Sequence, residues 1–204
     1  MPHISKSALN ISRESSGILR ETLRTPWFHL LTKTFMATDA FRVVLGLGSN
    51  LGDSRRIVLD VVTALRELLV ELRCASLYET SPLHVTDQGR FINTAVTGLY
   101  PSAQDQSVAA RKLLSQIQLI EARFGRDRSR ERRWGERSLD IDILLFGDLV
   151  INEPDLEIPH PRLRERRFAL EPLLELLPDA VEPGTFLSYA KICQALPDQG
   201  VSKL

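Results

Sequence analysis

Residues 139–146 (LDIDILLF) constrain the fold most, because they form a short, β-rich apolar run in which Asp140 and Asp142 stand at alternate positions. A glycine lies close to each end of this run, which is typical of a strand. Successive side chains of a strand point to opposite faces of the sheet. We therefore expect the two carboxylates to project side by side, while the apolar residues around them face the core, namely Leu139, Ile141 and Ile143.

This pair of carboxylates favours a site for Mg2+ and a nucleoside triphosphate. Mg2+ is bound through one or two carboxylates and takes its remaining ligands from phosphates and water. The preceding segment is rich in arginine, whose guanidinium group matches phosphate oxygens, at Arg126, Arg128, Arg130, Arg132, Arg133 and Arg137. A solvated strand face beside an arginine-rich surface loop is the plainer alternative. The convergence of Trp134, Gly135 and Arg137 on the Asp pair favours the site.

Composition sets the outer limits. The chain has 204 residues, 43% of them hydrophobic and 25% charged, which predicts one soluble globular domain. Its formal net charge is zero, so no general polyanion-binding surface is expected. Cys74 and Cys193 lie far apart without a CxxC motif, and we expect reduced thiols in a cytoplasmic protein. No apolar run is long enough to span a bilayer.

Residues 1–40 differ from the rest of the chain. They are rich in Ser, Thr and Arg, poor in acids and without a clear hydrophobic period, and Met36 would make a natural start. Three interpretations stay open: an extension from an upstream start codon, a disordered arm, or an organellar transit peptide, which shares this composition. We expect residues 1–40 to be such an extension and residues 41–204 to form a single domain.

Hydrophobic periodicity predicts strands and helices from residue 41 onward. Strands are expected at 41–48, 74–79, 91–99, 139–146 and, as a short edge strand, 149–151, and helices at 54–72, 106–124 and 168–177. Asp53 or Ser54 is a good N-cap for the first helix. Residues 80–90 should form a loop, and the prolines of 156–161 should keep that segment extended. The order β, α, β, β, α, β predicts an α+β fold, a ferredoxin-like two-layer sandwich of a mostly antiparallel sheet with helices packed on it.

The glycines of residues 46–52 (GLGSNLG) follow the first expected strand, where a dinucleotide-binding fingerprint would lie. Their spacing is GxGxxxG, which differs from that fingerprint, and the sequence contains no Walker A loop. We interpret the glycines as a tight turn from strand to helix.

Five motifs follow one another along the chain: 46–52 (GLGSNLG), 78–83 (YETSPL), 91–96 (FINTAV), 133–142 (RWGERSLDID) and 158–161 (IPHP) with Arg166 and Phe168. Together they resemble the 6-hydroxymethyl-7,8-dihydropterin pyrophosphokinase family of folate biosynthesis. The resemblance covers about residues 42–185, and five motifs at compatible spacing make it specific.

The resemblance implies a transferase that moves pyrophosphate from ATP to the hydroxymethyl group of the dihydropterin, with AMP leaving. The implied catalytic residues are Arg126, Arg137, Asp140 and Asp142, and the two aspartates would bind two Mg2+ ions. The implied ATP-binding residues are Gln118, Glu121, Arg126, Trp134, Arg137, His160 and Arg166, with Trp134 on a loop that closes over the reactants. The implied pterin-binding residues are Thr80, Pro82, Leu83, Phe91, Asn93 and Phe168, with the pterin held between the two phenylalanines.

Such a reaction depends mainly on positioning and on electrostatic stabilisation by metals and arginines, which agrees with the pattern of the residues themselves. The expected partners are the two small-molecule substrates, without nucleic acid, membrane or an obligate protein partner. From the residues alone, two alternatives stay open. One is a platform for single-stranded nucleic acid, made by Trp134 and the arginine-rich loop, and the other is a nicotinamide-dependent reductase that uses the glycine turn.

Overall fold

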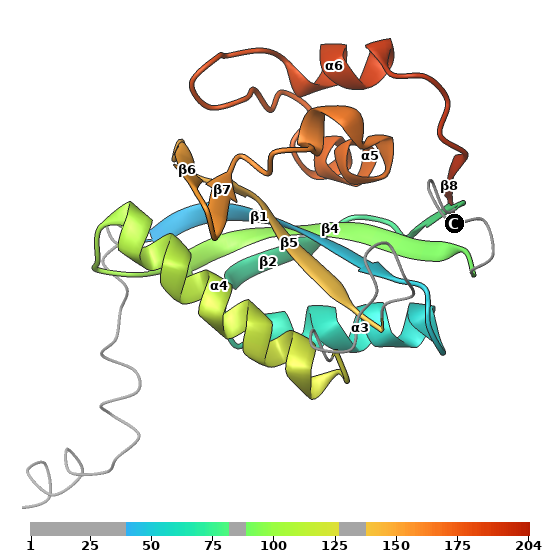
Figure 1. Ribbon diagram of the computed structural model, residues 1–204, viewed down its shortest axis with the longest axis horizontal. Helices are drawn as coiled ribbons and strands as arrows, with labels where there is room; N and C mark the ends of the chain where they lie inside the picture. Colours follow the sequence, from blue (N-terminus) through green and yellow to red (C-terminus); the bar gives the residue numbers. More distant parts are fainter. Residues whose placement is uncertain (1–39, 82–88, 127–137) are drawn as a thin grey trace, which may run out of the picture. The chain divides into compact units, whose positions relative to one another are not determined.

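A six-stranded sheet forms the centre of the part of the chain that the structure describes, residues 40–81, 89–126 and 138–204 (Figure 1). The structure is a computed structural model. The strand order is β5-β1-β4-β3-β8, β2 also pairs with β4, and all these pairs are antiparallel. The strands are β1 (Ala40–Ser49), β2 (Val70–Cys74), β3 (Tyr78–Thr80), β4 (Phe91–Pro101), β5 (Asp140–Phe146) and β8 (Val201–Lys203).

Helices α3 (Ser54–Leu65) and α4 (Gln106–Arg123) cover one face of this sheet (Figure 1). Their apolar sides pack against alternate residues of β1 and β5 in one hydrophobic core, which includes Leu45, Leu47, Val61, Leu113 and Ile141. Because burial of apolar surface is the dominant favourable term in folding, this face contributes much of the stability of the fold.

The opposite face is covered by α5 (Arg167–Leu176), with α6 (Tyr189–Ala195) beyond it, after the 3-10 helix η1 (Leu163–Glu165) (Figure 1). The hydrophobic core on this side includes Val44, Ala95, Leu144, Leu170 and Leu173. Strands β6 (Ile151–Glu153) and β7 (Leu156–Ile158) form a separate two-stranded sheet. The chain that follows β5 thus adds a helical layer over the second face.

The α+β fold expected from the sequence is confirmed. The elements follow the predicted order, and β1 lies between β4 and β5 in an antiparallel sheet. The predicted N-cap is also present, since the Asp53 carboxylate accepts a hydrogen bond from the backbone N–H of Arg56 at 3.1 Å. The layer made by α5 and α6, and the strand β8, go beyond the predicted two-layer core.

Three predicted elements differ from the structure. The short edge strand expected at 149–151 is instead β6, residues 151–153, which pairs with β7 in a separate sheet. The first helix ends at Leu65 rather than at residue 72, because Leu69 and Leu72 fit a helical period but are buried from the turn after α3 and from β2. No glycine or proline between residues 66 and 73 signals this end. The strand expected at 74–79 is divided, with β2 ending at Cys74 and β3 beginning at Tyr78.

Within the described ranges, no helix combines the length and the hydrophobicity that crossing a membrane requires.

Candidate active site

Asp140 and Asp142 project from the same face of β5, as the alternating pattern predicted. Their side chains are 26% and 33% exposed, whereas Leu139, Ile141 and Ile143 are buried. The strand is the last in the sheet order, so its outer edge has no neighbouring strand among the residues that the structure describes. The two carboxylates are therefore held side by side on a rigid element while remaining partly open to solvent.

Two glycines of β1, Gly46 and Gly48, lie beside these carboxylates and are called the glycine strip below. In the antiparallel register, Gly48 is opposite Asp140 on one side and Asn93 on the other, and Gly46 is opposite Asp142. Side chains at opposed positions share a face of the sheet. The two glycines thus contribute no side chains to the site face between β5 and β4, and the side chains of Leu144 and Asn93 approach the backbone closely at Gly46 and Gly48. Neighbouring strands are about 4.8 Å apart, so this strip separates Asp140 from Asn93 by about 10 Å.

The interpretation of the glycines as a tight turn is wrong for Gly46 and Gly48, which both lie inside β1. Only Gly52 belongs to the turn before α3, where its φ of +70° suits a residue without a Cβ. The sequence signal for this arrangement is the spacing of two between the glycines within an apolar β-rich run, because alternate residues of a strand lie on the same face.

The end of α4 brings Arg126 to Asp140. The N–H of Gly125 bonds to the carbonyl of Ala122, the N–H of Arg126 bonds to the carbonyl of Glu121, and Gly125 has φ +82°. This is a Schellman motif, which stops a helix and turns the chain sharply. The Arg126 guanidinium then lies 2.6 Å from Asp140 Oδ1 and also pairs with Glu121.

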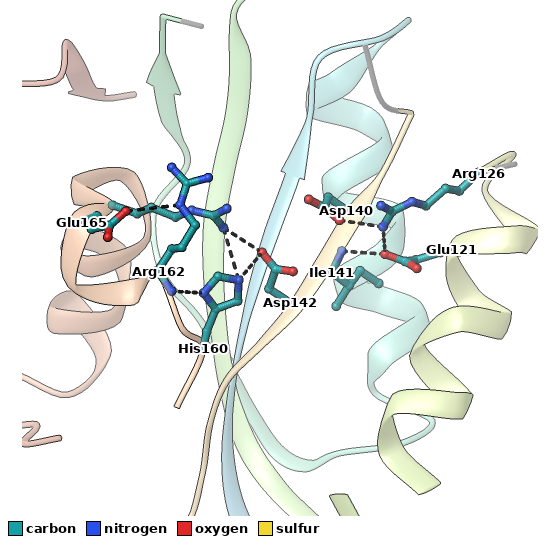
Figure 2. A network of polar contacts seen from close by, with 9 residues as sticks. Glu121, Arg126, Asp140, Ile141, Asp142, His160, Arg162 and Glu165 are labelled. Atoms are coloured by element: carbon teal, nitrogen blue, oxygen red, sulfur yellow. Dashed lines mark hydrogen bonds and ion pairs between the residues drawn. The ribbon is translucent and has the colours of Figure 1, made fainter. Parts of the chain in front are cut away.

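Glu121 anchors both the arginine and the strand. Its side chain is 1% exposed, and Oε1 accepts the N–H of Ile141 at 2.9 Å in addition to the Arg126 contact (Figure 2). A backbone donor at the open edge of a sheet needs such a partner when it is buried. The family resemblance implies a nucleotide contact for Glu121. It did not suggest that Glu121 holds the backbone between the two aspartates.

Asp142 has a second set of partners, from the segment between β7 and α5. Arg166 Nη1 lies 3.2 Å and His160 Nε2 lies 3.6 Å from Asp142 Oδ2. Figure 2 shows His160 on one side of the aspartate pair, and Glu121 with Arg126 on the other. These groups are more than fifteen residues from Asp142 in sequence, and only the fold brings them together.

His160 is held in one neutral form. The backbone N–H of Arg162 donates to Nδ1 at 3.1 Å, so the ring proton lies on Nε2, on the side of the Asp142 carboxylate. Burial, and then the nearby charge of Arg166, lower the pKa of His160 from 6.5 to about 4. At neutral pH the Nε2–H is therefore a hydrogen-bond donor on an uncharged ring.

Three candidate pterin residues lie on the far side of the glycine strip from the aspartates, namely Thr80, Phe91 and Asn93. Asn93 Nδ2 donates to Thr80 Oγ1 at 2.8 Å, both side chains are 5% exposed, and Phe91 pairs with Thr80 across β3 and β4. Phe168, near the start of α5, lies under Arg166, whose guanidinium carbon is 5.7 Å from the ring centroid. Arg166 thus contacts both Asp142 and Phe168, which links the acidic half of the site to the aromatic half.

Five other expected site residues are either exposed or outside the part of the chain that the structure describes. Gln118 is exposed on α4, one turn before Glu121. Pro82, Leu83, Trp134 and Arg137 lie outside the described residues, so their expected roles stay predictions.

The side-chain oxygens of Asp140 and Asp142 are suitable ligands for Mg2+. Both are carboxylates, each already balanced by a buried or half-buried arginine, and a hard cation prefers oxygen ligands. In the described part of the chain, no group of three or more His, Cys, Asp or Glu side chains is arranged to hold a metal. A cation here would depend on phosphate oxygens and water to complete its coordination, which is the usual way in which Mg2+ is bound together with a nucleotide.

Comparison with known proteins gives one consistent result. Residues 44–178 match the family model for 7,8-dihydro-6-hydroxymethylpterin-pyrophosphokinase. The 2-amino-4-hydroxy-6-hydroxymethyldihydropteridine pyrophosphokinase of Pseudomonas aeruginosa is 38% identical over 167 residues, which cover 80% of this chain and 96% of that protein.

Longer relatives match over a part of their length. The folic acid synthesis protein of Pneumocystis carinii is 35% identical over 83% of this chain and 22% of its own length. The chain thus spans about a fifth of that curated relative. The crystal structure of wild-type Plasmodium falciparum HPPK-DHPS is similar in fold, with a TM-score of 0.55 at 16% identity over 76% of this chain and 41% of that one.

Proposed function

The chain belongs to the 7,8-dihydro-6-hydroxymethylpterin-pyrophosphokinase family, and on that premise we propose that it transfers pyrophosphate from ATP to 6-hydroxymethyl-7,8-dihydropterin. The observation that best supports this proposal is the pair of carboxylates, Asp140 and Asp142, each paired with a different arginine on one face of β5. Cationic side chains and carboxylates in alternation suit a polyphosphate that carries its own metal ions.

The reaction needs little covalent help from the protein. The hydroxymethyl oxygen attacks the β-phosphorus of ATP, the bond to the oxygen that bridges the α- and β-phosphorus breaks, AMP leaves, and the hydroxyl proton passes to water. Charge builds on phosphate oxygens, so catalysis depends on alignment and on fixed positive charge. Arg126 and Arg166 would supply that charge, and His160 would donate its Nε2–H to a phosphate oxygen.

Two Mg2+ ions, held by Asp140 and Asp142 together with ATP, are part of this proposal and would neutralise charge on the transferred group. The buried contact of Glu121 with Ile141 keeps the backbone between the two aspartates fixed. The chain therefore holds both carboxylates in place before the nucleotide arrives.

The pterin would bind on the other side of the glycine strip. Thr80 and Asn93 would hydrogen-bond its polar edge, Phe91 and Phe168 would hold its ring by offset stacking, and Pro82 and Leu83 would complete the pocket. Burial of Thr80 and Asn93 supports this assignment, since buried polar groups that already share one hydrogen bond are well placed to discriminate between ligands.

Three further points belong to the proposal. Residues 41–204 would form a single pyrophosphokinase domain after an extension. The location would be cytoplasmic, which the free thiols of Cys74 and Cys193 support. The partners would be small-molecule substrates, without nucleic acid or an obligate protein.

The proposal is tested by measuring AMP formation from ATP and Mg2+, with and without the hydroxymethyldihydropterin. We expect AMP only when the pterin is present, in equal amount with the pterin diphosphate. AMP that forms at the same rate without the pterin, or ATP binding without any AMP, would contradict the proposed acceptor.

A further inference from the structure

Glu175, near the end of α5, is the centre of a hydrogen-bond network that the phosphate chemistry does not use. Its Oε1 accepts the N–H of Ser76 at 3.1 Å and the Ser76 hydroxyl at 2.8 Å. Its Oε2 accepts the Tyr78 hydroxyl at 2.8 Å and lies 3.1 Å from Lys203 Nζ. Each carboxylate oxygen thus has two donors, and these come from β3, from the segment before it and from β8.

The Glu175 carboxylate at the centre of this network is negatively charged at neutral pH. Burial opposes ionisation of Glu175, but hydrogen bonds from Tyr78, Ser76 and Lys203 outweigh it and lower the pKa of Glu175 to about 2. Burial, and then the bond to Glu175, raise the pKa of Tyr78, so its hydroxyl remains a donor. Hydrogen bonds to an ionised acceptor are stronger and more directional than neutral ones.

The network joins helix α5, which carries Phe168, to the strand pair β3 and β4, which carries Thr80 and Asn93. Tyr78 is two residues before Thr80 in β3 and directly opposite Asn93 in β4. Phe168 is seven residues before Glu175 in α5, which is about two helical turns, so the two side chains lie on the same side of the helix. Glu175 therefore ties the helix of Phe168 to the strand pair of Thr80 and Asn93.

Other contacts hold the start of α5: the N–H of Arg167 donates to the Gln199 side-chain oxygen at 2.9 Å, and Arg166 pairs with Asp142. The Arg166 side chain makes no capping bond of its own, and Pro172 lies within the helix. Because proline has no backbone N–H, the carbonyl of Phe168 lacks its usual helical donor. Apolar packing of Leu170 and Leu173 on the sheet holds the helix down, but such packing is not directional. The bonds of Glu175 add directional contacts near the other end of the helix, to Ser76 and to Tyr78 of β3.

We propose that Glu175 is a positioning residue for the pterin: by bonding Ser76 and Tyr78 it sets the separation between Phe168 and the Thr80–Asn93 pair, and so controls pterin affinity without touching the ligand. This inference rests on the proposed function for the identity of the ligand. It assigns no role to Glu175 in binding the nucleotide, whose candidate residues lie on α4, on β5 and around His160.

The test compares Glu175→Gln and Tyr78→Phe with Glu171→Gln. Glu171 lies on the same helix, pairs with Arg167 and has the same charge, so it is a matched control. For each variant, KM for both substrates, kcat, pterin binding with a non-hydrolysable ATP analogue and Mg2+, and thermal unfolding are measured. We expect Glu175→Gln to raise KM and Kd for the pterin about tenfold, because small displacements of binding groups are costly.

KM for ATP should stay within about twofold in all three variants, and Tyr78→Phe should follow Glu175→Gln to a smaller degree, since it removes one donor. A purely structural role would lower thermal stability and leave the ratio of the two KM values unchanged, which would overturn the inference. An equal pterin defect in Glu171→Gln would also overturn it. Pterin binding without AMP formation in the wild-type protein would instead contradict the proposed function, while the binding measurement would still test Glu175.

Discussion

Gly48 and Asn93 stand directly opposite each other in β1 and β4, and a Cβ added to Gly48 would lie 2.9 Å from Asn93 Oδ1. The amide of Asn93 cannot move away easily, because it is buried and donates to Thr80 at 2.8 Å. The absence of a side chain at Gly48 thus lets the amide oxygen of Asn93 lie close to the backbone of β1.

Gly48→Ala should therefore weaken pterin binding, by about tenfold or more, since a buried polar group would be displaced or covered. Gly46→Ala is the matched comparison: its Cβ would meet Leu144 Cδ1 at 3.3 Å, and a leucine side chain at that distance can shift. Pterin affinity and KM for both substrates would be measured for each. Equal losses in the two variants would show that the contact with Asn93 is not the cause.

Asp140→Ala and Asp142→Ala should each lower the rate of AMP formation by at least about 100-fold at saturating Mg2+, because each removes a metal ligand from the phosphate site. The thermal unfolding temperature should change little, as both side chains are partly exposed and outside the hydrophobic cores. Activity close to that of the wild type in either variant would remove that residue from the proposed metal site.

Phe168→Ala should raise KM for the pterin by about tenfold, because offset stacking contributes about 1 kcal/mol beyond the area it buries. Phe168→Leu, which keeps apolar bulk without the ring, should give a smaller effect. KM for ATP should rise less than KM for the pterin. Equal rises for both substrates would point to displacement of Arg166, which lies over this ring.

His160 should make the protein less stable in weak acid. Its pKa is lowered from 6.5 to about 4 in the folded state, so between these values the unfolded chain binds more protons than the folded one. The free energy of unfolding therefore falls as pH is lowered through this range, by up to about 3 kcal/mol at the lower end.

His160→Gln should lack this contribution. Denaturant unfolding of both proteins between pH 7 and pH 4 would measure it, with the wild type losing more stability than the variant as pH falls. Parallel curves for the two proteins would contradict the assignment of a buried neutral ring.

Local features of the site could be predicted from sequence, and contacts between distant segments could not. The alternation of Asp140 and Asp142 on one face follows from the period of a strand, and the N-cap at Asp53 follows from its side chain. The hydrogen bond from Ile141 to Glu121 exists because β5 is an edge strand, and nothing in a single sequence identifies the edge. The same holds for Tyr78 and Glu175, which are 97 residues apart.

The misplaced end of the first helix has a different cause. Leu69 and Leu72 satisfy a helical period, and no glycine or proline lies between residues 66 and 73, so the local pattern favours a longer helix. Pairing of β2 with β4 outweighs that preference, as tertiary contacts often do. The role of Gly46 and Gly48 could not be predicted for a similar reason. It depends on β4 and β5, which lie on either side of β1 and carry Asn93 and the two aspartates.

One face of the sheet is a hydrophobic core and the other carries the candidate site, and this difference affects how such a protein can be engineered and how it can evolve. The face under α3 and α4 is a continuous apolar core, whereas the other is interrupted by Gly46 and Gly48 where the ligands would lie. Substitutions that improve packing under α3 and α4, away from Gln118 and Glu121, can therefore accumulate without entering the site, which relaxes the common trade-off between stability and activity. A more thermostable variant is best sought on that side, with the glycine strip left untouched.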